Sequence, residues 1–109
     1  MTFDQMANKV TSNVANGPPQ FDIAIILMII EMLQNLIPIL QDFCNKDPED
    51  VIKMAKGPSW MERRVVKMEA IKVFGRRGYR QLGNDVCDAV FKTAAESTPQ
   101  DIAELYQQV

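Results

Sequence analysis

The amino-acid sequence predicts a small, soluble, all-α protein: a bundle of about five helices around a buried central helix, forming one domain over residues 1–109. Apolar residues recur at spacings of three and four, as on one face of a helix. Pro and Gly separate these stretches, and Ser, Thr or Asp stands where several of them begin. A hydrophobic fraction of 47% with 24% charged residues is an ordinary globular balance.

The first predicted helix covers residues 3–14, where Phe3, Met6, Val10 and Val14 follow a 3-4-4 spacing. It should end at Asn16-Gly17-Pro18-Pro19, because Gly accepts left-handed geometry and Pro cannot continue the hydrogen-bond ladder.

The second predicted helix covers about residues 21–45 and contains eight consecutive apolar residues, 23–30. We expect it to begin fully buried and to end half exposed, with a kink at Pro38. Its apolar stripe is Ile26, Ile30, Leu33, Ile37 and Leu40, opposite Glu31, Gln34, Asn35, Gln41 and Asp42.

Residues 23–41 are long enough to be considered as a membrane span. The aliphatic side chains contribute only about 4–7 kcal/mol to insertion, which Glu31 and three amides largely cancel. No Lys or Arg lies next to the flanking Asp22 and Asp42 to anchor the span at the headgroups. The sequence therefore favours a core helix, or one buried by oligomerisation, over a membrane helix.

Asp47-Pro48-Glu49-Asp50 begins a third, short helix that ends at Lys56-Gly57-Pro58. Asp47 is the predicted N-cap, Pro48 takes the first helical position, and the two acids stabilise the positive end of the helix dipole. A calcium loop is excluded, because the stretch lacks the required glycine and the Glu at the twelfth position.

Ser59-Trp60-Met61-Glu62 is a capping box that begins a fourth helix, over about residues 60–74. It has two apolar flanks, and Arg63, Arg64 and Lys67 form a basic ridge between them. One flank is Met61, Val65, Met68 and Ile71; the other is Val66, Ala70 and Val73. Trp60 is expected to anchor the core or an interface.

Gly75-Arg76-Arg77-Gly78 breaks this pattern, and a short β-hairpin near residues 71–82 is an alternative there. A helix over residues 84–96 follows, with Val86, Val90 and Ala94 on its apolar face. Thr98-Pro99-Gln100-Asp101 then caps a last helix.

The chain contains no histidine, which removes the commonest general base and metal ligand, so no enzyme activity, cofactor or metal is expected. Cys44 and Cys87 are 43 positions apart and are predicted to be buried, reduced thiols. Asp85 and Asp88 share a helix face, but acids in a first helical turn are explained by the dipole.

Charge is strongly segregated along the chain. Residues 53–80 carry nine basic and two acidic side chains, a net charge of +7, whereas the remainder carries three and twelve, a net of −9. The candidate binding patch within the basic segment 63–80 is Arg63, Arg64, Lys67, Arg76, Arg77, Tyr79 and Arg80. It could be a solvated or internally paired face, a docking surface for an acidic protein, or a nucleic-acid site with Tyr79 stacking on a base.

The sequence favours a non-enzymatic protein-interaction or assembly module that associates with itself or with an acidic protein surface. A small virion or phage-encoded component would fit this description. The alternative is a nucleic-acid-binding accessory protein that uses residues 63–80. With no apolar leader in residues 1–10, the expected location is the cytoplasm or a particle assembled inside the cell, and membrane binding is not expected.

Overall fold

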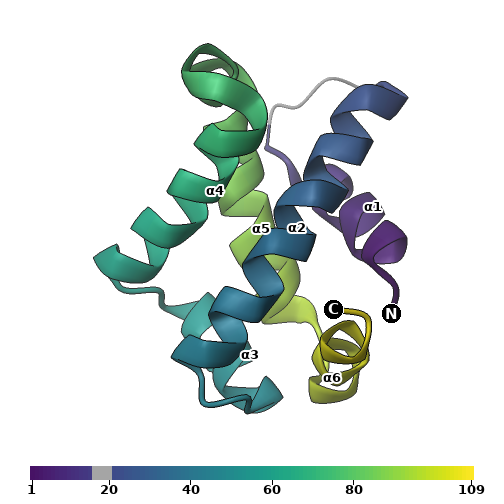
Figure 1. The fold of residues 1–109 in the computed structure, drawn as a ribbon, viewed down its shortest axis with the longest axis vertical. Coiled ribbons are helices and arrows are strands. Elements are labelled where there is room, and N and C mark those ends of the chain that lie inside the picture. Colours follow the sequence, from purple (N-terminus) through teal and green to yellow (C-terminus); the bar gives the residue numbers. More distant parts are fainter. Residues whose placement is uncertain (16–20) are drawn as a thin grey trace.

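The computed structural model describes residues 1–15 and 21–109, and all regular structure in that part of the chain is helical (Figure 1). The predicted all-α class is therefore confirmed. The elements are α1 (Phe3–Asn13), α2 (Ile23–Phe43), α3 (Pro48–Lys56), α4 (Trp60–Gly78), a π-helical turn η1 (Tyr79–Gly83), α5 (Asn84–Glu96) and α6 (Pro99–Gln107). The predicted stop at Asn16–Pro19 lies outside the described residues.

Most of the helices begin at side-chain caps. Asp22 and Asp47 cap α2 and α3 through single hydrogen bonds to backbone N–H groups. Ser59–Glu62 and Thr98–Asp101 form full capping boxes at α4 and α6, as the sequence predicts. A third capping box, Thr2–Gln5, begins α1. These contacts lie within one helical turn, so they fix where the helices begin independently of the tertiary packing.

α2 and α5 contribute the largest numbers of buried side chains to the core. The ribbon shows how the other helices are arranged around them (Figure 1). α5 packs against α1, α3 and α4, and α2 packs against α1 and α4. From α2 the core receives Leu33, Ile37 and Leu40 of the predicted stripe, each at most 5% exposed. The expected central helix thus exists from Ile29 onward in α2, where Glu31, Gln34 and Asn35 face solvent as expected.

The prediction that α2 begins fully buried is wrong. Ile23 is 76% exposed and Leu27 58% exposed, and Ile29 is the first residue of the helix to be fully buried. The short helices of this chain do not surround the first two turns of α2. Its expected apolar stripe at Ile26 and Ile30 is only partly buried. The helix continues through Pro38 without interruption.

The alternative hairpin near residues 71–82 is also wrong, because the chain stays helical across this segment. Only Gly75 departs from helical geometry, with φ 77° and ψ 165°. That region of backbone space is essentially restricted to glycine. The chain bends there and continues through η1 into α5 without a new side-chain cap. Asn84 is therefore not the free helix start that the sequence suggested.

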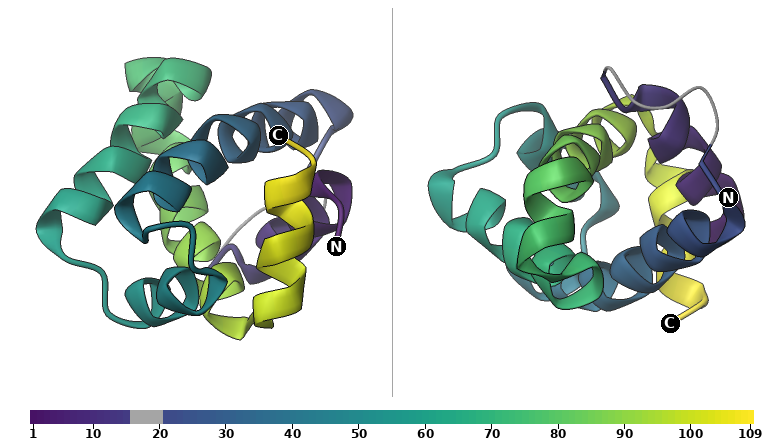
Figure 2. Two further views of the ribbon diagram at one scale, coloured as in Figure 1. Left: turned by 60° about the horizontal axis from the view of Figure 1, so that its bottom comes forward. Right: turned by 90° about the horizontal axis from the view of Figure 1, so that it is seen from above.

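The two termini lie close together beside α6 (Figure 2). The N-terminal ammonium group forms an ion pair of 3.1 Å with Glu104, and the Gln108 side-chain amide donates a hydrogen bond to the Met1 carbonyl oxygen. Ile102 and Leu105 of α6 are fully buried. These contacts hold the last helix against the start of the chain.

We predict that Gly75→Ala lowers the free energy of unfolding by about 1–3 kcal/mol, measured by urea denaturation. A Cβ atom at Gly75 would meet no other atom within 4 Å, so the cost comes from the backbone conformation alone. The matched control is Gly57→Ala, because Gly57 has an equally open surrounding but a negative φ of −150°. Equal denaturation midpoints for the two variants would show that the bend at Gly75 is not the source of strain.

Candidate functional site

The predicted binding patch lies along α4 and at its junction with η1. Its six cations are all exposed, and Tyr79 is partly buried. Arg63, Arg64 and Lys67 project from the middle of α4, whereas Arg76, Arg77 and Arg80 lie beyond the bend at Gly75. We call the whole set the basic surface: Arg63, Arg64, Lys67, Arg76, Arg77, Tyr79 and Arg80.

An open groove of about 330 Å³ brings the first part of the basic surface together between α4 and α5. Two of its cations lie over aromatic rings. The Arg63 guanidinium is 5.9 Å from the centre of the Phe91 ring, and the Lys67 ammonium is 5.5 Å from that of Tyr79. Cation–π contacts at such exposed sites contribute about 0.5–1 kcal/mol each. The groove is lined by Trp60, Arg63, Arg64, Lys67, Tyr79, Asn84, Cys87, Asp88 and Phe91.

A second groove, of about 480 Å³, shares Lys67 and Tyr79 with the first and extends along the other side of their contact. It adds Arg76 and Arg80 together with the apolar side chains of Met68 and Ile71. The structure thus joins six of the seven predicted residues across two neighbouring grooves. Arg77 lines neither groove.

Tyr79 is a structural part of this surface rather than a free stacking platform. Lys67 lies over its ring, and a Cβ atom on Gly83 would come within 3.0 Å of that ring. The Tyr79 hydroxyl donates a hydrogen bond of 3.1 Å to Asn84 Oδ1. Burial raises the pKa of Tyr79, and the nearby Cys87 and Asp88 add to the shift. A base could stack on Tyr79 only by displacing these contacts.

The cations of the basic surface have no acidic partner within the described residues. The ion pairs found there are Met1–Glu104 and Lys72–Glu69, the latter at 3.0 Å. Asp88 lines the first groove, yet no cation lies within 4 Å of it. An internally paired face, one of the alternatives from the sequence, is therefore not what the described part of the chain forms. The positive charge is available to a partner or to solvent.

Large apolar side chains are exposed beside the basic surface. Trp60 is 71% exposed, so it is not a core anchor, and Met61 and Met68 are each about half exposed. The expected apolar flank of α4 made by these two methionines is therefore uncovered, whereas Val66 and Ala70 on the other flank are fully buried. Trp, Met and Arg are the residues most enriched at protein–protein interfaces.

A second uncovered region is the start of α2. At about 100° per residue, Ile23, Ala24, Leu27 and Met28 fall on one face, and all four are exposed. We call them the α2 strip. Further along the same face the residues become polar, with Glu31, Gln34 and Asn35.

Among the described helices, α2 is long and apolar enough to cross a membrane, with a mean hydropathy of 2.2. Core helices of soluble proteins pass the same test. The buried residues of α2 lie from Ile29 to Leu40, and Leu33 and Ile37 among them pack in the core.

The turn between α2 and α3 carries negative charge. Asn45 and Lys46 both adopt positive φ, 51° and 63°, and reverse the chain so that Asp47 caps α3. Beside the turn is a cavity of about 310 Å³ lined by Phe43, Cys44, Asn45, Asp50, Met54 and Glu62. Glu62 uses Oε1 in the α4 capping box, and its Oε2 is buried without a hydrogen-bond partner among the described residues. Sequence analysis assigned Asp50 and Glu62 to helix ends only, and missed that packing brings them together.

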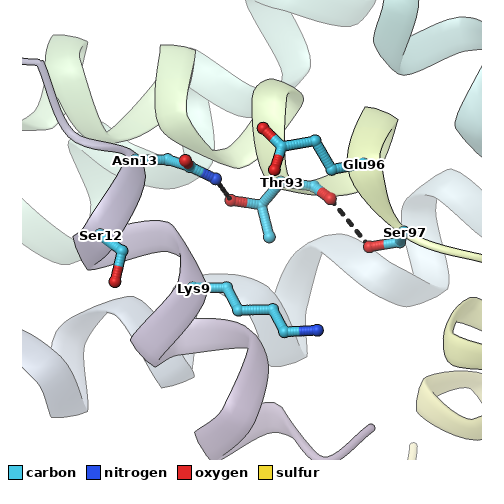
Figure 3. Close-up of a pocket in the computed structure, with 6 residues that line it drawn as sticks. All are labelled: Lys9, Ser12, Asn13, Thr93, Glu96 and Ser97. Carbon is cyan, nitrogen blue, oxygen red and sulfur yellow. Dashed lines mark hydrogen bonds between the residues drawn. The ribbon is translucent and has the colours of Figure 1, made fainter.

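A polar cleft of about 270 Å³ lies between α1 and α5 (Figure 3). Buried Thr93 accepts a hydrogen bond from Asn13 Nδ2 at 3.0 Å and donates one to the Ala89 carbonyl oxygen at 2.7 Å. The hydroxyls of Ser12 and Ser97 also donate to backbone carbonyls. These hydroxyl groups all donate to backbone carbonyl oxygens, and Lys9 and Glu96 complete the lining of the cleft. The hydrogen bond between Asn13 and Thr93 joins α1 to α5.

The described residues offer few other candidate sites for catalysis or metal binding. Residues 1–15 and 21–109 contain no group of three or more Cys, Asp or Glu placed to hold a metal ion. Asp85 and Asp88 lie in a continuous helical stretch, so the dipole at a free helix start does not explain them. Comparison with protein-family models, curated proteins and solved structures finds no match to this chain.

The predicted state of the two cysteines is confirmed: Cys44 and Cys87 are both free and buried. Burial raises the pKa of both thiols, and that of Cys87 to about 12. We therefore predict slow labelling of both cysteines by a thiol reagent at pH 8, because the thiolate is the reactive form. Denaturant should make both react fast and completely. Fast labelling of the native protein would contradict the burial of Cys44 at the end of α2 or of Cys87 in α5.

Proposed function

We propose that this chain is a non-enzymatic assembly module that associates with copies of itself. The observation that carries the proposal is the α2 strip, Ile23, Ala24, Leu27 and Met28, which the chain's own helices leave exposed. Contiguous apolar surface on a soluble protein is typical of an interaction site.

The position of the α2 strip supports a docking role. The solvent face of α2 becomes polar from Glu31 onward, so this face does not need apolar residues in order to fold. Full burial of an Ile or Leu side chain contributes roughly 1.5–3 kcal/mol. Ile23 and Leu27 together therefore offer several kcal/mol to a contact and contribute little to the isolated chain. Insertion of α2 in a membrane is less favourable, because it would remove Leu33 and Ile37 from the core.

We predict that Leu27→Glu lowers the association constant at least tenfold while leaving the thermal stability of the monomer nearly unchanged. Leu27 is 58% exposed, so a charge there stays in water in the monomer and is buried only in the contact. Light scattering over a range of protein concentrations measures the mass. The matched control is Asn35→Glu, which places the same charge on the same face of α2, where it is already polar.

Two outcomes would contradict the proposal. One is a wild-type protein that stays monomeric at all concentrations tested. The other is a Leu27→Glu variant that associates as well as the Asn35→Glu control, because the α2 strip would then not be in the contact.

The second candidate function is nucleic-acid binding, and the observation that favours it is the row of cations without acidic partners along α4 and η1. Arginine and lysine on one face provide the sequence-independent attraction for phosphates. Two features weaken this candidate: Tyr79 is already covered by Lys67, and Asp88 lines the first groove.

Replacing Arg76, Arg77 and Arg80 together by Gln separates the two functions. If the chain binds nucleic acid, the wild type should bind a short duplex or single strand with a log–log salt slope of roughly −3 to −6. The triple variant should then flatten that slope by about 2–3 units, with its oligomeric mass unchanged. We expect instead negligible nucleic-acid binding by the wild type at ~150 mM salt, because the net charge of the chain is −2. Binding of the wild type at that salt concentration would favour the second candidate.

A further inference from the structure

The fold places opposite charges at opposite ends of the molecule. The junction of α4 and η1 lies at one end of the 33 Å long axis, and the turn from α2 to α3 lies at the other (Figure 1). The first end carries Arg76, Arg77 and Arg80, which we call the basic end. The second carries Asp47, Glu49 and Asp50, which we call the acidic end.

Neither end is neutralised within its own chain. No carboxylate of the described residues lies within 4 Å of an arginine of the basic end. Near the acidic end, the cations are Lys46 in the turn and Lys53 and Lys56 in the last turn of α3, and none of them forms an ion pair with a described acid. Because the two ends are separated by the length of the molecule, they cannot pair with each other inside one chain.

The acidic end also has a shape that fits an arginine. The cavity of about 310 Å³ beside the turn is lined by the acidic residues Asp50 and Glu62 and by Phe43, which is 48% exposed. A guanidinium group pairs with carboxylates through a planar fork of donors and stacks on aromatic rings. The buried Glu62 Oε2, which lacks a partner among the described residues, is an acceptor that such a donor would satisfy.

We propose that copies of this chain contact one another head to tail, with the basic end of one copy docked on the acidic end of the next and an arginine in the cavity lined by Asp50 and Glu62. This inference rests on the proposed self-association and specifies its geometry. A contact between two different surfaces is heterologous, so it leaves one free end of each kind and builds a ring or a filament rather than a closed dimer.

The test uses two full-length variants, and in each of them the charges of one end are neutralised. The first carries Arg76→Gln, Arg77→Gln and Arg80→Gln, and the second carries Glu49→Gln and Asp50→Asn; Asp47 is kept because it caps α3. Each variant alone should associate at least tenfold more weakly than the wild type at low salt, measured by sedimentation velocity. An equimolar mixture should form a tight 1:1 complex that does not grow, because it contains one intact pair of ends and no free complementary end.

A control matched to the second variant carries Asp4→Asn and Glu96→Gln, which remove the same two negative charges from exposed positions on α1 and α5. This control should assemble as the wild type does. If each single-end variant associates with wild-type affinity, or if the mixture binds no more tightly than either variant alone, the head-to-tail contact is wrong while self-association stands. A wild type that is monomeric under all conditions overturns the proposed function itself.

Discussion

The direction of the chain after α4 depends on the backbone of Gly75. A residue with a Cβ atom would be strained there, because the conformation at Gly75 is almost closed to other residues. With the bend, the chain passes through η1 and returns as α5, which packs against α1, α3 and α4. The bend also determines that Arg76, Arg77 and Arg80 project from one end of the molecule rather than continuing the row formed by Arg63, Arg64 and Lys67.

The return through η1 adds a second constraint, on Tyr79. Its ring lies under the Lys67 ammonium and close to the backbone of Gly83, and a larger residue at position 83 would press on the ring. Tyr79 therefore joins α4 to the following turn, and it divides the basic surface into two grooves that share it. A tyrosine that the sequence offers as a base-stacking residue thus serves first to stabilise the turn.

The features that sequence analysis predicted well are those decided within a few residues. The starts of α3, α4 and α6 follow from Asp47, Ser59 and Thr98, because a cap is satisfied within its own first turn. Apolar spacing likewise identified the buried side of α2 from Leu33 to Leu40. The bend at Gly75 was missed because two glycines around two arginines are compatible with a hairpin and with an interrupted helix, and only the packing of α5 decides between them.

The candidate site was predicted only in part, for the same reason. A run of basic residues is visible in the sequence, but the first groove depends on α5 supplying Asn84, Asp88 and Phe91 from the opposite side. The pairing of Asp50 with Glu62 around one cavity could not be foreseen, since each residue has a sufficient local explanation as a helix-end acid. An apolar run such as residues 23–30 indicates that its side chains become buried, but it does not indicate whether the same chain or another molecule buries them.

The charges at the two ends and the exposed apolar side chains together limit how copies of the chain can contact one another. A symmetric dimer built on either charged end would place like charges against each other, which is unfavourable, whereas contact between unlike ends is attractive along the long axis. The α2 strip begins at the same end of the molecule as the arginines, so apolar and basic groups are presented together there (Figure 1). The other end presents Phe43 beside its carboxylates. In the proposed head-to-tail contact, charge would set the direction and the salt sensitivity, and the apolar side chains would supply most of the affinity.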